Sequence, residues 1–297
     1  MGAAVFGFRE CATQAARLAA ELGVPSHEVS VHRFPDGESL VRVDPAPATA
    51  ILCRSLAHPN AKLVELLLAA SALRDSGAKR VMLVAPYLCY MRQDKAFEPG
   101  QAVSQRVVGK LIAGHFDGLL TIDPHLHRIH SLGEVMPGID AVSVTAAPVL
   151  SAAIDAAENP VLVGPDGESR QWVAAIAGPL GLDFTVGTKT RSGDRKVEIH
   201  FEGIARIAGR VAVLVDDVIA SGVTLEVAAR QLREAGAARI EALATHCLAS
   251  DADLAMLRAA GIDRIRSTET APGPTASIPV AGLLAEAIRA HGWLGED

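Results

Sequence analysis

The chain has 297 residues, of which 49% are hydrophobic and 21% charged, and its formal net charge at pH 7 is −6. This composition predicts a globular protein with a sizeable core, and the length favours two domains over one. A net negative charge gives no overall field that would attract nucleic acid or an anionic membrane, so we predict that neither is a partner.

The N-terminal residues lack a basic region followed by an apolar core, and no apolar stretch reaches about 18 residues without charge. The four cysteines stand far apart without CxxC spacing, which argues against a disulfide framework or a zinc site. We therefore expect a cytoplasmic protein with no membrane span.

Short apolar runs alternate with amphipathic segments along the chain. The amphipathic residues 61–80 precede the apolar run 81–87, and residues 225–237 precede 238–246 in the same way. Because these apolar runs show no polar face, the pattern predicts an α/β fold with helices on both sides of mainly parallel sheets.

An internal repeat supports a division of the chain. "LRDSGAKRVMLVA" at 73–85 and "LREAGAARIEALA" at 232–244 share one residue order before a predicted strand. The repeat is explained either by the common use of Gly at helix ends or by a duplicated domain of about 150 residues. Under duplication we expect domains at 1–145 and 146–297, with the final helix able to pack back on the first.

The segment "VAVLVDDVIASGVTLEVAAR", residues 211–230, carries the clearest chemical signal. Its apolar run ends on Asp216 and Asp217, at the carboxyl end of a predicted strand, where open α/β sheets bind ligands. Carboxylates repel phosphate, so the pair suits sugar hydroxyls or Mg²⁺. Helix capping and simple solvation of the two acids are the plain alternative.

The turn at 220–224 follows the acid pair and leads into a predicted helix, which we expect Thr224 to cap and Gly236 to end. Backbone N–H groups and the positive end of a helix converge there, a geometry that binds phosphate. The hydroxyls of Ser221 and Thr224 add donors. Acid pair and turn together predict a site for a phosphorylated sugar.

This order resembles the PRPP-binding loop of the type I phosphoribosyltransferase fold. Other segments occur in the order seen in ribose-phosphate diphosphokinases, the PRPP synthetases: "FPDGES" at 34–39, "APYLCYMRQDKAFEPGQAVS" at 85–104, "TIDPHLHRIH" at 121–130, "GPDGES" at 164–169 and "KTR" at 189–191. The resemblance runs from about residue 30 to the last predicted helix. "RQDKAFEPGQAVS" is more similar to the archaeal type of this family.

The resemblance implies a role for each matching residue. ATP would be bound by Phe34, Asp36, Glu38, Arg92, Gln93 and His125. Ribose 5-phosphate would be bound by Asp216, Asp217, Ala220, Ser221, Gly222, Val223 and Thr224. Mg²⁺ would be held by His125 and Asp166, and the catalytic cations would be Lys189 and Arg191.

The activity implied is transfer of the diphosphoryl group of Mg-ATP to the 1-hydroxyl of ribose 5-phosphate, giving PRPP and AMP. In this family one subunit lends its 34–38 loop to a neighbour's active site, so a homodimer or larger homo-oligomer is implied. Two alternatives remain at this point: a PRPP-dependent phosphoribosyltransferase, which would leave the motifs at 34–39 and 85–104 without a role, and a noncatalytic regulatory paralogue.

The turn departs from the pattern of many synthetases. Ala220, Ser221 and Val223 stand where those proteins have Asp, Thr and Gly. A β-branched residue resists a positive φ angle that Gly adopts freely. If the backbone required that angle at Val223, the loop would be strained or its substrate different.

Overall fold

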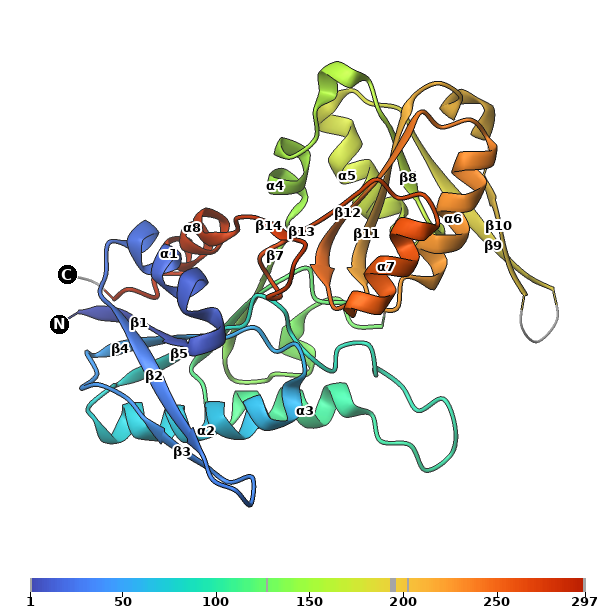
Figure 1. The fold of residues 1–297 in the computed structure, drawn as a ribbon. Coiled ribbons are helices and arrows are strands. Elements are labelled where there is room, and N and C mark those ends of the chain that lie inside the picture. Colours follow the sequence, from blue (N-terminus) through green and yellow to red (C-terminus); the bar gives the residue numbers. More distant parts are fainter. Residues whose placement is uncertain (1, 127, 193–195, 202, 296–297) are drawn as a thin grey trace. The chain divides into compact units, whose positions relative to one another are not determined.

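The structure is a computed structural model that describes residues 2–126, 128–192, 196–201 and 203–295, apart from the side chains of 189–192 and 196–198. The chain forms two compact units (Figure 1). The first unit comprises Met1–Thr145, Thr270–Pro272 and Val280–Asp297, and the second comprises Ala146–Glu269 and Gly273–Pro279.

The first unit is built on a seven-stranded sheet of order β3-β2-β1-β4-β5-β6-β7, parallel except for the β2–β3 pair. Its strands are β1 (Ala3–Phe8), β2 (Ser26–Arg33), β3 (Ser39–Arg42), β4 (Thr49–Cys53), β5 (Arg80–Val84), β6 (Gly118–Ile122) and β7 (Asp140–Val144). Its helices are α1 (Ala12–Leu22), α2 (Pro59–Asp75), α3 (Ser104–Ala113) and α8 (Ala281–Ala290), with short 3-10 turns η1 (Arg9–Cys11) and η2 (Leu132–Glu134). Every residue of β1, β4 and β6 is buried, because helices cover both faces of the sheet.

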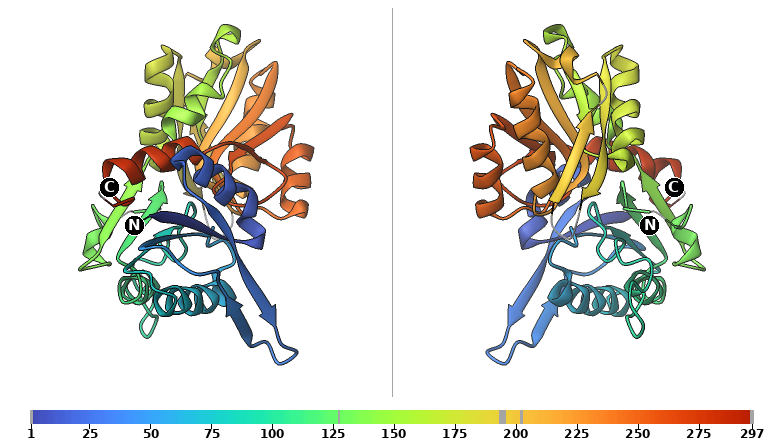
Figure 2. Two further views of the ribbon diagram at one scale, coloured as in Figure 1. Left: turned by 90° about the vertical axis from the view of Figure 1, so that its left-hand side faces the viewer. Right: turned by 90° about the vertical axis from the view of Figure 1, so that its right-hand side faces the viewer.

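The second unit repeats this architecture, with strand order β10-β9-β8-β11-β12-β13-β14 and an antiparallel β9–β10 pair at one edge. Its strands are β8 (Val161–Gly164), β9 (Phe184–Ser192), β10 (Lys196–Phe201), β11 (Val211–Ile219), β12 (Arg239–Cys247), β13 (Arg264–Thr268) and β14 (Ala276–Ile278). Its helices are α4 (Ala147–Ala152), α5 (Arg170–Leu180), α6 (Val223–Glu234) and α7 (Asp251–Ala259), with 3-10 turns η3 (Ala156–Glu158), η4 (Gly167–Ser169) and η5 (Ile204–Ile207). Figure 2 shows helices on both faces of this sheet.

The two sheets match strand for strand, so the sequence repeat has a structural meaning. Its first copy is the connection from α2 to β5, and its second copy is the connection from α6 to β12. These connections occupy the same place in the two sheets. The fold-class prediction of two similar α/β units is confirmed. Among the described residues, no helix is long and apolar enough to cross a membrane.

The last residues of the chain contribute to the core of the first unit. Helix α8 packs on α1, and Trp293 beyond it is buried. The Trp293 Nε1 donates a hydrogen bond over 2.8 Å to the Oδ2 of Asp140, the first residue of β7. At Gly118 in β6, an added Cβ would lie 3.0 Å from the Trp293 ring. The first sheet is therefore shaped to receive this ring.

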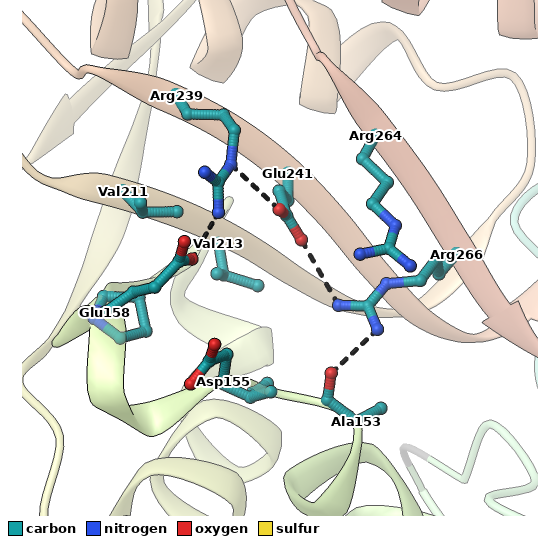
Figure 3. Close-up of a pocket in the computed structure, with 11 residues that line it drawn as sticks. Ala153, Asp155, Glu158, Val211, Val213, Arg239, Glu241, Arg264 and Arg266 are labelled. Atoms are coloured by element: carbon teal, nitrogen blue, oxygen red, sulfur yellow. Dashed lines mark hydrogen bonds and ion pairs between the residues drawn. The ribbon is translucent and has the colours of Figure 1, made fainter.

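A group of charged side chains closes the amino ends of β12 and β13 in the second unit (Figure 3). Glu241 accepts from Arg239 Nε at 3.0 Å and from Arg266 Nη2 at 3.2 Å, and Arg266 Nη1 donates to Ala153 O at 2.7 Å. Burial lowers the pKa of Arg266, and the nearby Arg264 lowers it further. Glu241 is thus the carboxylate that compensates two guanidinium groups around a cavity of about 150 Å³.

Replacing Glu241 tests how much its carboxylate contributes to the stability of the fold. Glu241→Gln leaves the largely buried Arg266 without its counter-charge, so we expect the free energy of unfolding to fall by about 3 kcal/mol. Urea denaturation measures this change. Glu226→Gln, which breaks the exposed pair with Arg230 on α6, is the control and should cost about 0.5 kcal/mol or less. Equal losses in the two variants would contradict the assignment.

Candidate functional site

The acid pair lies near the end of β11, between β8 and β12 in the second sheet. Asp217 is buried and Asp216 is half-buried. The Asp216 Oδ1 accepts from the backbone N–H of Asp217 at 3.1 Å, and Asp217 Oδ1 accepts from the N–H of Val218 at 2.8 Å. These bonds fix both carboxyl groups to the strand, at the sheet edge where the sequence predicted a ligand.

Asp166 follows β8, the strand that pairs with β11 in parallel. Its Oδ1 accepts from the backbone N–H groups of Glu168 at 3.1 Å and Ser169 at 3.3 Å, so it caps the short turn η4. Gly164 permits this turn to fold tightly, because an added Cβ there would lie 2.2 Å from Ser169 Oγ. The parallel pairing therefore brings Asp166 to the same end of the strands as Asp216 and Asp217.

The surroundings of Asp216 disfavour its ionised form. Burial raises the pKa of Asp216 well above its ordinary value, and the charges of Asp217 and Asp166 raise it further. Closely spaced carboxylates resist ionisation together unless a cation or hydrogen-bond donors compensate them. Hydrogen-bond donors of a ligand would therefore favour the ionised form of these side chains.

The turn after β11 has its left-handed residue at Gly222, with φ of +73°. An added Cβ there would also approach Leu257 Cδ1 to 2.9 Å, so both backbone and space favour Gly. Helix α6 begins at Val223, and Gly222 is its N-cap. The expected capping by Thr224 is therefore wrong, whereas the expected end at Gly236 is confirmed: Ala235 is the C-cap, and Gly236 follows it in the left-handed conformation with φ of +84°. The conditional concern about Val223 does not arise, since no positive φ falls on that residue.

The start of α6 presents hydrogen-bond donors. No side chain of the described residues caps the helix at Gly222, and Val223 is 52% exposed beside it. Ser221 is exposed, while Ala220 and Thr224 are half-buried. The first N–H groups of this helix and the two neighbouring hydroxyls form a cradle suited to a phosphate group.

In the first unit, residues 34–38 form the tip of the β2–β3 hairpin, which leaves the edge of the sheet (Figure 2). Phe34 N–H donates to Glu38 O at 2.8 Å, and Asp36 Oδ1 accepts from Glu38 N–H at 3.1 Å. Phe34 is 40% exposed and packs edge-on against His32, with ring centroids 4.8 Å apart. The predicted residues Phe34, Asp36 and Glu38 are therefore displayed together on an ordered, exposed tip.

Arg92 and Gln93 lie exposed on the long connection from β5 to α3. The Gln93 Oε1 accepts from Ser104 Oγ at 2.8 Å, at the start of α3. The next residue, Asp94, is buried and accepts from Arg128 Nη1, which lies 2.7 Å from each carboxylate oxygen. The motifs at 85–104 and 121–130 contained both partners of this pair, but nothing in the sequence paired them.

His125 lies half-buried in the loop that follows β6. This loop leaves the strand through Asp123, a non-glycine residue with φ of +37° whose N–H donates to Val144 O at 2.9 Å. Arg128 is in the same segment, so its pair with Asp94 ties the His125 loop to the Arg92 loop. The first unit thereby joins two of the predicted nucleotide segments.

Lys189 and Arg191 lie in β9, where their backbones oppose Ile199 and Val197 of β10. Their side chains are outside the described part of the chain. The segment is therefore a strand of an edge hairpin, and the sequence motif remains the basis for the predicted role of these two cations.

Comparison with known proteins matches both units. Residues 3–114 match the N-terminal domain of ribose phosphate pyrophosphokinase, and residues 138–273 match the phosphoribosyl transferase domain. A ribose-phosphate pyrophosphokinase of Methanopyrus kandleri is 36% identical over 277 residues, 92% of this chain and 94% of that protein. One of Halobacterium salinarum is 33% identical over 278 residues, 92% and 96%. The crystal structure of phosphoribosylpyrophosphate synthetase from Mycobacterium smegmatis matches with a TM-score of 0.83 and 28% identity, covering 98% and 99% of the two chains.

We predict that the Asp216 carboxylate lowers the stability of the fold and strengthens the binding of ribose 5-phosphate. Asp216→Asn removes a charge that Asp217 and Asp166 repel, so we expect the free energy of unfolding at pH 7 to rise by about 0.5–2 kcal/mol. Binding of ribose 5-phosphate, measured by calorimetry, should weaken at least about tenfold. The exposed Asp251→Asn should change neither quantity. A variant that is less stable than the wild type would show that the repulsion is already compensated.

Proposed function

The chain belongs to the ribose-phosphate pyrophosphokinase family, and from that premise we propose how its residues transfer the diphosphoryl group of ATP to the 1-hydroxyl of ribose 5-phosphate, giving PRPP and AMP. The observation that carries the proposal is the acid pair beside an uncapped helix start, on a chain whose relatives cover both units. A plain phosphoribosyltransferase would explain only the second unit.

Ribose 5-phosphate binds at the carboxyl ends of β8 and β11. Asp216 and Asp217 accept hydrogen bonds from ribose hydroxyls, which offset the burial and, secondarily, the repulsion by Asp217 and Asp166 that raise the pKa of Asp216. The 5-phosphate lies against the 220–224 turn, namely Ala220, Ser221, Gly222, Val223 and Thr224. The left-handed Gly222 turns successive N–H groups toward one point, and the helix dipole favours the negative charge.

ATP binds to the residues that the first unit displays: Phe34, Asp36, Glu38, Arg92, Gln93 and His125. The exposed Phe34 ring offers an apolar face to the adenine, and Arg92 offers a cation to the phosphates. The hairpin tip extends from the edge of its sheet, which suits a loop that serves the active site of a neighbouring subunit. This arrangement supports a homodimer or larger homo-oligomer as part of the proposal.

Asp166 and His125 would hold Mg²⁺. Among the described residues, no three His, Cys, Asp or Glu side chains gather closely enough to hold a metal ion by themselves. Mg²⁺ in phosphoryl-transfer sites usually takes only one or two carboxylates and completes its shell with water and substrate phosphates. Asp166, anchored by two backbone N–H groups and adding negative potential at Asp216, fits such a site. When bound, the ion neutralises phosphate charge.

Lys189 and Arg191 stabilise the charge that develops on the transferred group. Transfer of this kind depends mainly on alignment of the two substrates and on neutralisation of phosphate oxygens, and cations on a mobile segment supply both when they close over the site. An edge hairpin such as β9–β10 is a suitable carrier, because it is attached to the sheet on one side only.

The activity is tested by measuring AMP formed from ATP with and without ribose 5-phosphate, over a range of Mg²⁺ concentrations. We expect AMP and PRPP in equal amounts, formed only when the sugar phosphate is present. AMP formation that does not depend on the sugar phosphate, or PRPP consumption with a nucleobase in its place, would assign a different reaction.

The cationic segment gives a second test. Lys189→Ala should lower kcat by about a thousandfold, because a group that acts on the transition state is lost, and should leave the Kd of ribose 5-phosphate unchanged. Lys79→Ala, an exposed lysine of the first unit, serves as the control with normal kcat. A near-normal kcat for the Lys189 variant would remove this residue from its role.

A further inference from the structure

Glu65 is a buried carboxylate that no motif of the sequence includes. It lies in α2, and its side chain is only 1% exposed. Burial alone would raise the pKa of Glu65, but hydrogen bonds from Arg33 and Arg54 outweigh burial and hold the pKa below its ordinary value. A charge this deeply buried is retained at a cost, so its partners indicate what it does.

One oxygen of Glu65 holds the root of the β2–β3 hairpin. The Oε1 accepts from Arg33 Nε at 2.9 Å and from Ser39 Oγ at 3.3 Å. Arg33 and Ser39 are opposite each other in the hairpin register, and they immediately precede and follow the tip at 34–38. A single carboxylate oxygen therefore joins both strands at the point where the tip begins.

The other oxygen is fixed from behind by Arg54. Its Nη2 donates to Glu65 Oε2 at 2.5 Å, its Nε donates to Glu10 Oε1 at 2.8 Å, and its Nη1 donates to Lys62 O at 3.1 Å. The guanidinium also lies over the Phe8 ring, 3.7 Å from the centroid, and is 1% exposed. Since each nitrogen of Arg54 has a partner, the Glu65 carboxylate has one defined orientation.

The position of Arg54 in the first sheet corresponds to the position of the acid pair in the second sheet. β4 has the same place in the first sheet as β11 has in the second, and η1 follows β1 as η4 follows β8. β11 carries near its end the two acids proposed above to bind the sugar, whereas β4 is followed by Arg54, which is paired with acids of its own unit. Beside it lies an open cleft of about 720 Å³, which Arg33 and Glu65 also line.

We propose that Glu65 is a positioning residue for the nucleotide, and that the Glu65–Arg54 pair uses the ligand position of the first sheet to anchor the Phe34–Glu38 tip. This inference rests on the proposed function of that tip in binding ATP. An isolated two-stranded hairpin is marginally stable in water, so an unanchored tip would sample many orientations, and ATP would have to select one. The anchor holds the tip in its bound arrangement before ATP arrives.

The magnitude of the effect depends on burial. Arg33 is 62% exposed, and an exposed ion pair contributes little because water screens it. Here the carboxylate partner is buried and immobile, so the hydrogen bond to Arg33 is charge-assisted at a fixed point. Losing it should weaken ATP binding about tenfold, which corresponds to about 1.4 kcal/mol.

The test uses the full-length protein and two independent readouts. Arg33→Met and Ser39→Ala each remove one bond to Glu65 at the surface, and Glu65→Gln removes the charge itself. Hydrogen exchange at the amides of Phe34 and Gly37, both bonded within the tip, reports the order of the tip without any substrate. Steady-state kinetics separate KM for ATP from KM for ribose 5-phosphate and from kcat. Asp44→Asn breaks the exposed pair with His27 at the far end of the same hairpin and is the matched control.

We expect Arg33→Met to raise the exchange rates of the tip amides and the KM for ATP about tenfold, and Ser39→Ala to raise both about threefold, with KM for ribose 5-phosphate unchanged. The control should leave all values unchanged. Unaltered exchange in Arg33→Met and Ser39→Ala would overturn the anchor, and faster exchange with an unchanged KM for ATP would overturn its role in positioning nucleotide. A wild-type protein that forms no AMP would refute the proposed function alone, and the exchange data would still decide the anchor.

Discussion

The parallel pairing of β8 with β11 is the constraint on which the site of the second unit depends. It brings Asp166, which follows one strand, to the edge where the other strand presents Asp216 and Asp217. Neither strand alone would place these three carboxyl groups at the same end of the sheet, next to the turn at 220–224. Strand register therefore places the charges of Asp217 and Asp166 near Asp216, where they add to burial in raising the pKa of that carboxyl group.

The same sheet supports opposite chemistry in the first unit. Where β11 carries Asp216 and Asp217, β4 is followed by the Arg54 guanidinium, which is hydrogen-bonded within its own unit. The first unit therefore uses this end of its sheet for internal anchoring and displays its predicted nucleotide-binding residues on a hairpin and two loops instead. At corresponding strand ends, the two copies of one architecture therefore carry opposite charges: carboxylates after the apolar run of β11, and a buried guanidinium after β4.

The sequence predicted the features that depend on local pattern. Alternating apolar and amphipathic segments indicated both sheets, and the order of acids, small residues and helix at 211–230 indicated the strand, turn and helix that the structure has there. It failed where an outcome depended on backbone geometry, since the letters of the turn do not show whether Gly222 or Val223 carries the positive φ. It also missed Glu65 and Arg54, because an isolated charge in an apolar stretch acquires its meaning only from partners distant in the chain, such as Glu10 and Arg33.

The burial of Trp293 against the first sheet has a consequence for biosynthesis. The first unit contains the strands of residues 3–144 but cannot complete its core until the ribosome has made α8 and Trp293, whereas the second unit is contained in residues 146–279. Domains generally fold as they emerge, in order from the N-terminus. In this chain the second unit can complete its fold first. Until Trp293 has been synthesised, the space beside Gly118 in the first sheet stays unfilled. A nascent chain that stops short of α8 would thus damage the unit that was synthesised first.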